Sequence, residues 1–299
     1  MPSVPQMIRS VSRQKHVQQY IVEKDYALSY LLAAIAQTDG LGNHLVLKGG
    51  TALKKLYFAN YRFSEDLDYS TRTLGPIQQI NARMETAVRT MGEMLNERGP
   101  FQISLEPLVL NQPHPGGQKA YVVRVQFPEQ RQALCRLKVE ITVDEPILTP
   151  VNVNPILHGF AEHMTVQIPA YSLAEITVEK LRALLQSKAR LQERGWGASR
   201  VCRDYYDLWN LLQVPGIRSP ALLPLLPEKC TARNVTYQSP RDFVTEDLLA
   251  VASQEWTQQI LPFVPDAPPA EELLPQCDLL SNRCGINFFR WISRQDEIG

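Results

Sequence analysis

Two aspartates, Asp66 and Asp68, are the first residues of this chain whose spacing could do chemistry. They lie in RFSEDLDYS, residues 62–70, where apolar and polar residues alternate as in a β-strand. Alternate side chains of a strand share a face, so we expect both carboxylates on one side, with Arg62 and Ser64. Like charges this close repel each other unless a cation neutralises them. The pair therefore indicates a site for Mg²⁺, which prefers carboxylate oxygens and substrate phosphates as ligands.

A glycine pair precedes these aspartates. HLVLKGG, residues 44–50, reads as a short apolar strand, and TALKKLYFANY, residues 51–61, as a helix. Gly49 and Gly50 would let backbone N–H groups approach a phosphate at the positive end of that helix. Thr51 could cap the helix or contact the phosphate. An isolated D-x-D is more often a solvated strand face, but the neighbouring glycines favour a phosphate-and-metal site.

A third carboxylate comes from LCRLKVEITV, residues 134–143. Its alternation places Glu140 on a polar face beside Lys138. If this strand lies next to the aspartate strand, the three carboxylates could hold two divalent cations, as in-line phosphoryl or nucleotidyl transfer requires. The alternative is that Glu140 forms a cross-strand ion pair with a lysine or arginine.

The remaining pattern predicts a mixed domain followed by a helical one. Further helices are expected over 18–36 and 76–98, and strands over 101–110 and 121–127, with a turn at 112–117 between these strands. The first half then reads α-β-α-β-α-β-β-β. Beyond Pro169 we expect helices separated by proline-rich connectors; the helices cover 172–193, 201–213 and 241–262, and the connectors 214–227 and 262–275. The predicted domains are 1–170 and 171–299, with the boundary between 165 and 172.

Composition limits the classes of function. Lys plus Arg and Asp plus Glu number 31 each among 299 residues, which argues against a protein that coats DNA. The chain shows no apolar leader and no run of 18 apolar residues, so we expect a cytoplasmic protein without a membrane segment. The five cysteines are scattered, which fits a reducing compartment and offers no zinc site. His158 and His163 are five residues apart, the wrong interval for a metal site on one helical face.

Several of these stretches together resemble a known family. L-x-G-G-T-A-L followed by R-x-S-x-D-L-D is similar to the signature of the AbiEii-type nucleotidyltransferase toxins of bacterial abortive-infection toxin–antitoxin pairs. These belong to the DNA-polymerase-beta-like nucleotidyltransferase superfamily. VEKDYALSYLL, ITVEKLRALL and RDYYDLW match in the same order, so the resemblance spans roughly residues 20–212. It implies an α+β fold: a polymerase-beta-like mixed sheet with flanking helices, then a helical C-terminal lobe that completes the active-site cleft.

The resemblance also assigns roles to particular residues. The nucleotide-binding residues would be Gly49, Gly50, Thr51, Ser64 and Lys180. The metal ligands would be Asp66, Asp68 and Glu140. At the position of Glu140 the superfamily often has an aspartate. These three would be catalytic together with Lys180 and Asp204, which match the family's helical lysine and the acid of its last motif. Glu23, Lys24 and Asp25 fall in a family motif, but we expect them to anchor the first helix.

Residues 180–203 form a basic segment, which is independent of the resemblance. Seven basic side chains and one acid, Glu193, lie between Lys180 and Arg203, which suits a triphosphate or an RNA backbone. For Arg182, Lys188 and Arg194 a solvated helix face is the favoured interpretation. Lys180 precedes Leu184 by one turn and could extend its ammonium from the core edge to a phosphate. Asp204 and Asp207 share a helix face, and Asp207 could simply pair with Arg203.

The expected activity is Mg²⁺- or Mn²⁺-dependent nucleotidyl transfer from a nucleoside triphosphate to a nucleic acid, with tRNA 3′ ends as candidate acceptors. The resemblance further implies a role in abortive infection, a phage defence, and a cognate antitoxin that is a DNA-binding repressor. Two alternatives remain open. One is a kinase-like phosphotransferase that uses the same carboxylates. The other is a non-catalytic nucleotide-binding module acting by sequestration, although such a module would be free to lose the D-x-D pair.

Overall fold

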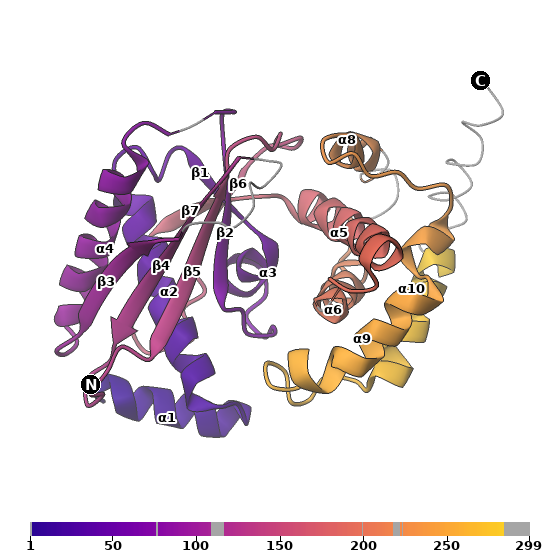
Figure 1. Cartoon of the computed structure of the whole chain (residues 1–299). Helices are drawn as coiled ribbons and strands as arrows, with labels where there is room; N and C mark the ends of the chain where they lie inside the picture. Colours follow the sequence, from indigo (N-terminus) through magenta and orange to yellow (C-terminus); the bar gives the residue numbers. More distant parts are fainter. Residues whose placement is uncertain are drawn as a thin grey trace. The chain divides into compact units, whose positions relative to one another are not determined.

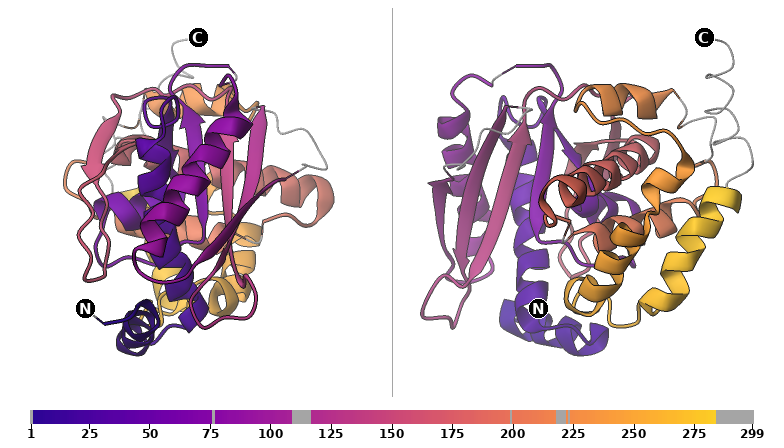
Figure 2. Two further views of the ribbon diagram at one scale, coloured as in Figure 1. Left: turned by 90° about the vertical axis from the view of Figure 1, so that its left-hand side faces the viewer. Right: turned by 45° about the vertical axis from the view of Figure 1, so that its right-hand side comes forward.

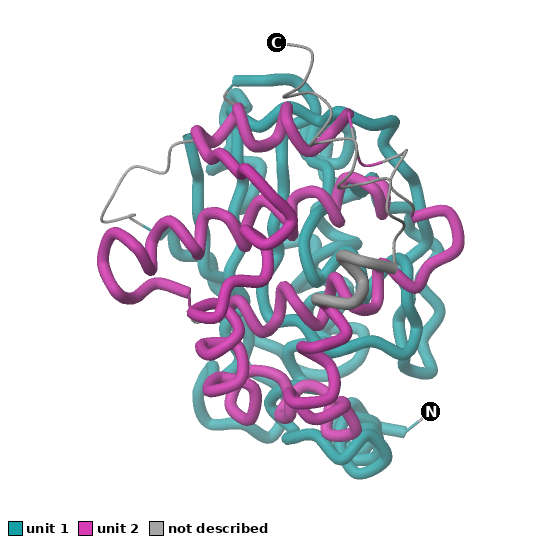
Figure 3. Tube along the Cα trace, turned by 90° about the vertical axis from the view of Figure 1, so that its right-hand side faces the viewer, with its two compact units in different colours: residues 1–171 teal, residues 172–299 magenta. Residues whose placement is uncertain are grey.

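The computed structural model describes residues 2–75, 77–108, 117–198, 200–217, 222 and 224–283. The chain divides into two compact units, Met1–Tyr171 and Ser172–Gly299 (Figure 3). The first is an α+β unit built on a mixed sheet with flanking helices. The second is helical in its described residues. The fold class expected from the sequence is therefore confirmed.

Seven strands form the sheet of the first unit (Figure 1). Their order is β3-β4-β5-β2-β1-β7-β6, with parallel pairing between β2 and β5 and between β1 and β7, and antiparallel pairing elsewhere. The strands are β1 (Leu45–Lys48), β2 (Asp66–Thr71), β3 (Gln102–Pro107), β4 (Gln118–Gln126), β5 (Cys135–Thr142), β6 (Asn152–Pro155) and β7 (Gln167–Ala170). The aspartate strand β2 thus lies at the centre, between β5 and β1.

Helices α2 (Gln19–Gln37) and α4 (Ile80–Asn96) pack together and cover one face of this sheet (Figure 2, left). Leu67, Val139 and Ile141, which alternate with the polar residues of β2 and β5, are at most 1% exposed. Burying such side chains contributes about 1.5–3 kcal/mol each. One face of the central strands is therefore core, which leaves Asp66 and Asp68 on the other. Helix α1 (Val4–Lys15) packs against α2.

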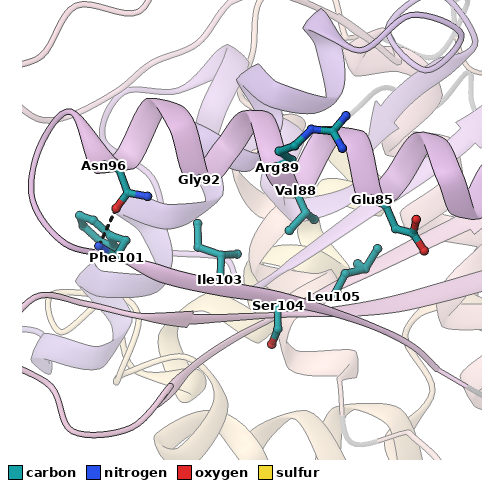
Figure 4. Close-up of a pocket in the computed structure, with 9 residues that line it drawn as sticks. All are labelled: Glu85, Val88, Arg89, Gly92, Asn96, Phe101, Ile103, Ser104 and Leu105. Carbon is teal, nitrogen blue, oxygen red and sulfur yellow. Dashed lines mark hydrogen bonds between the residues drawn. The ribbon is translucent and has the colours of Figure 1, made fainter.

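An open hollow of about 400 Å³ lies between α4 and the edge strand β3 (Figure 4). Apolar side chains of both elements line it, with Glu85 and Arg89 from the helix. Gly92 lies in the middle of α4, and a Cβ added there would meet only the Ile103 side chain, at 3.9 Å. The missing side chain of Gly92 therefore helps to keep the hollow open.

The glycine turn starts a shorter and less regular helix than expected. Helix α3 (Gly49–Ala52) continues as the π-helix η1 (Leu53–Tyr57), and the chain is irregular from Phe58 until β2 begins at Asp66. The prediction that Arg62 and Ser64 share a strand face with the aspartates is wrong, because both precede the strand.

The second unit contains α5 (Leu173–Arg194), α6 (Val201–Leu211), α8 (Leu225–Thr231), the 3₁₀ turn η2 (Pro240–Phe243), α9 (Glu246–Gln259) and α10 (Ala270–Arg283). The helix expected over 241–262 is thus broken into η2 and α9. Helices α8 and α10 begin inside stretches predicted as connectors. Pro227 fits because it lies in the first turn of α8, and Pro269 because it directly precedes α10, whereas Pro275 lies inside α10.

Three elements of the first unit gave no clear sequence signal: α1, β6 and β7. The turn predicted at 112–117 lies outside the described residues except for Gly117, which has a φ of +57°. The strand predicted over 101–110 is described as far as residue 108, and β3 ends at Pro107.

Candidate active site

A row of charged side chains crosses the three central strands. Asp68 of β2 pairs in register with Glu140 of β5 on one side and with Lys48 of β1 on the other. Residues directly opposite each other in neighbouring strands project from the same face of a sheet. Asp66, one step along the same face, is opposite Lys138. The sheet register therefore gathers two aspartates, one glutamate and two lysines on the face that α2 and α4 leave uncovered.

The Glu140 carboxylate is engaged by neighbours on this polar face. Its Oε1 lies 2.8 Å from Lys138 Nζ and accepts a hydrogen bond of 2.6 Å from Gln118. This matches the ion-pair alternative in kind, although the lysine comes from the same strand. No group of three metal-ligating side chains is assembled among the described residues. The two aspartates are therefore the stronger metal candidates, and Glu140 would exchange Lys138 for a cation if it joined them.

The glycine turn lies directly against this carboxylate row. Gly49 has a φ of +73°, and a Cβ there would be 3.0 Å from Oδ2 of Asp68. At Gly50 a Cβ would come within 2.4 Å of the Arg62 guanidinium. Gly49 therefore disfavours a side chain by backbone conformation and by approach, whereas a side chain at Gly50 would require the Arg62 guanidinium to move. The pair allows the start of α3 to contact the aspartate strand.

Thr51 fastens the turn to the strand. Its buried hydroxyl donates a hydrogen bond to the Asp66 carbonyl and shares a second, 2.8 Å long, with the Ser64 hydroxyl. Thr51 does not cap the helix, because the N-cap residue of α3 is Lys48. Two of the residues expected to bind nucleotide thus hold each other and the first aspartate in place.

Lys48 and Glu145 were missed by the sequence interpretation. Lys48 Nζ lies 3.5 Å from Oε2 of Glu145 and 5.7 Å from the centre of the Tyr171 ring. The side chains of Lys48 and Glu145 are largely buried, at 11% and 2% exposure. Tyr171 donates a hydrogen bond of 2.7 Å to Ser70, the next residue of β2 on the same face. The one available signal was the position of Lys48, a lysine that ends an otherwise apolar strand directly before the glycine pair.

Lys24 and Asp25 of α2 form ion pairs with residues that lie next to the site, as expected for an anchoring segment. Lys24 forms an ion pair of 2.7 Å with Glu65, the residue before Asp66. Asp25 forms a buried ion pair of 2.8 Å with Lys55 of η1. Burial lowers the pKa of Lys55, and the charge of Asp25 opposes that shift. Helix α2 is thus tied both to the approach to β2 and to the π-helix.

The later motifs meet within the second unit. Lys180 of α5 lies 2.7 Å from Asp204 and 2.8 Å from Asp207, both of α6. Asp207 is fully buried, so its negative charge needs this cation. The Arg203 guanidinium lies 4.7 Å from the centre of the Phe263 ring. The family lysine and the RDYYD motif therefore form one ion cluster.

Other basic residues of α5 differ in their surroundings. Arg182 is 8% exposed and lies 3.8 Å from Glu179, so the solvated face predicted for it is wrong. Lys188 forms an ion pair with Asp242. Arg194, near Glu193 and about half exposed, is on the solvated face as expected.

The described cysteines are buried free thiols: Cys135, Cys202, Cys230 and Cys277. Burial raises the pKa of Cys135 and Cys277 to about 12 and that of Cys202 and Cys230 to about 11. These thiols therefore stay protonated and unreactive near neutral pH.

The family described as nucleotidyl transferase AbiEii toxin, type IV toxin–antitoxin system, matches over residues 30–280. No curated protein matches the chain. Within the described ranges, the helices are all too short or too polar to cross a membrane.

Proposed function

Because the chain belongs to the AbiEii family of nucleotidyl transferase toxins, we propose that it transfers a nucleotidyl group from a nucleoside triphosphate to an RNA acceptor. The enzyme is a nucleotidyltransferase of a toxin–antitoxin system. The observation that carries the finer proposal is the contact between the glycine turn and Asp68. This contact places the backbone of Gly49 and Gly50, which carry no side chains, beside the two aspartates. A triphosphate and its cation would meet there.

The donor chemistry of this site fits Mg²⁺ or Mn²⁺. Asp66 and Asp68 provide hard carboxylate oxygens on one face of β2, and both side chains are half-buried. Those two residues would hold the ion, with Glu140 as a third ligand after it releases Lys138. When bound, the ion neutralises charge on the triphosphate.

The chain's own residues do the remaining work. The turn at Gly49 and Gly50 would position the phosphates, and the Thr51–Ser64–Asp66 hydrogen bonds keep that turn at a fixed distance from the carboxylates. In the reaction, the acceptor hydroxyl oxygen bonds to the α-phosphorus while the bond from that phosphorus to the pyrophosphate oxygen breaks. Glu140 is the candidate acceptor for the hydroxyl proton. By resemblance to the family, Lys180 and Asp204 are also assigned to catalysis.

The biological proposal follows from the family. A toxin of a type IV system implies an antitoxin. We propose that this antitoxin is a DNA-binding repressor and that the pair acts in abortive infection against phage.

The test uses the full chain with total RNA, Mg²⁺, and each nucleoside triphosphate labelled in turn at the α or the γ position. We expect the α label to enter RNA with wild type and with the exposed-surface control Asp39→Asn, and not with Asp66→Asn combined with Asp68→Asn. Entry of the γ label would instead identify a phosphotransferase. Absence of any transfer by wild type, or equal transfer by the double variant, would refute the proposal and favour a nucleotide-binding module.

A further inference from the structure

The loop that joins α5 to α6 presents a tryptophan to solvent. Trp196 is 67% exposed, whereas Trp256 is 3% exposed and Trp209 is half-buried. An exposed tryptophan gains nothing from burial, and most of the described large aromatic side chains of this unit are buried. The placement therefore needs an explanation outside the stability of the fold.

The loop holds this side chain outward with a defined backbone. Gly195 caps α5 in the left-handed region at a φ of +75°, with its N–H bonded to the Leu191 carbonyl at 2.8 Å. Gly197 has a φ of +101°, and a Cβ there would lie 3.4 Å from Cδ of Arg190, so the chain turns back over the arginine stem. Ala198 is buried at 3% exposure and anchors the far side. The backbone of Trp196 therefore lies between two glycines in left-handed conformations.

Two arginines lie near Trp196. The Arg194 guanidinium lies 6.0 Å from the centre of the Trp196 ring, within reach of a cation–π contact. Arg190 is exposed and lies below the loop. Over residues 190–198 the sequence carries two cations, Arg190 and Arg194, and one acid, Glu193. The chain as a whole has a net charge of zero, so this excess is local.

An exposed aromatic ring flanked by arginines has the chemistry that recognises single-stranded nucleic acid. Bases stack on aromatic faces whatever their sequence, and guanidinium groups contact the phosphates between them. A membrane-binding surface would need several apolar side chains together. We propose that Trp196 is a base-stacking platform and that Arg190 and Arg194 contact the backbone of a single-stranded RNA. This rests on the proposed function in taking RNA as the acceptor class.

The experiment measures binding without chemistry. A fluorescein-labelled, 12-nucleotide, unstructured RNA is titrated with the full chain carrying Asp66→Asn and Asp68→Asn, without triphosphate, and anisotropy is recorded. Adding Trp196→Ala is expected to weaken binding roughly 5- to 150-fold, the range that corresponds to one stacked base. Trp196→Phe should lose less. Leu134→Ala removes an equally exposed apolar side chain (68%) from the other unit and should bind as the parent does.

Two further measurements separate stacking from charge. Arg194→Gln should weaken binding and reduce its dependence on salt, whereas Trp196→Ala should leave that dependence unchanged. The affinity for a blunt RNA duplex of the same length should be the same with and without Trp196→Ala. Unchanged melting temperatures for these surface variants would show that the fold is intact.

The outcomes distinguish this inference from the proposed function. If single-stranded RNA binds Trp196→Ala as tightly as the parent, the stacking platform is refuted, whatever the transfer assay shows. If binding depends on Trp196 while wild type transfers no label, the platform stands and the nucleotidyl-transfer proposal fails. Loss of antitoxin binding by Trp196→Ala, with RNA binding retained, would reassign the loop to a protein partner.

Discussion

At the scale of single residues, Gly49 couples backbone conformation to the chemistry of the site. Its φ of +73° strains any other residue, and the nearest atom to an added Cβ is the Asp68 carboxylate oxygen. We expect Gly49→Ala to lower the free energy of unfolding by about 1–2 kcal/mol and to reduce nucleotidyl transfer strongly. Gly75 is the matched control, because its φ of +111° is also strained but its surroundings are open. Gly75→Ala should lose stability and keep activity; if both variants keep activity, the close approach to Asp68 is irrelevant to transfer.

A second residue makes stability depend on pH. Burial, and then the charge of Lys55, lower the pKa of His158 from 6.5 to about 4, although Glu162 lies 3.6 Å away and Asp25 also opposes the shift. Between these two pKa values the unfolded chain binds a proton that the folded chain does not. Unfolding free energy should therefore fall as pH drops from about 6.5 to about 4.

The measurement is urea unfolding across this pH range. His158→Gln should flatten the dependence, whereas His163→Gln, at an exposed position, should leave it unchanged. Equal slopes for wild type and His158→Gln would contradict the assignment.

At the scale of elements, the hollow beside α4 offers a stabilising substitution. Gly92 has ordinary helical surroundings, and an added Cβ would make only a van der Waals contact with Ile103 (Figure 4). Alanine is favoured over glycine in a helix interior by about 0.8–1.0 kcal/mol. We expect Gly92→Ala to raise the free energy of unfolding by a similar amount, measured by urea denaturation, without changing nucleotidyl transfer. A destabilised variant would show that the hollow is needed by the fold.

The elements also show what the sequence could predict. Period-2 alternation identified β2 and β5 because one face of each is core, and the same rule assigned Asp66 and Asp68 to the polar face of one strand and Glu140 to that of the other. That the two strands are neighbours comes from the structure. Short strands such as β6, whose residues Asn152–Pro155 are largely exposed, carry no such alternation. The pairing of Lys138 with Glu140 and of Lys180 with two aspartates depends on side-chain geometry and on long-range packing. Composition and spacing alone do not determine these contacts.

At the scale of the whole molecule, a neutral protein is expected to act through local sites. Induced expression of wild type in bacteria that lack the antitoxin should arrest growth, because a family toxin modifies its acceptor catalytically. Asp66→Asn with Asp68→Asn should permit growth at equal protein levels on an immunoblot, as should co-expression of the antitoxin with wild type. Arrest by the double variant would mean that toxicity needs no catalysis.

The π-helix η1 also makes the chain sensitive to its length at one point. A π turn contains one residue more than an α turn, so removing a residue before Lys55 and closing the turn to α geometry would move Lys55 by one position along the helix. Lys55 would then turn away from Asp25, and a buried pair broken in this way costs about 3–5 kcal/mol. We therefore expect insertions and deletions at residues 53–55 to destabilise the fold, whereas substitutions that keep the ion pair between Lys55 and Asp25 should be tolerated.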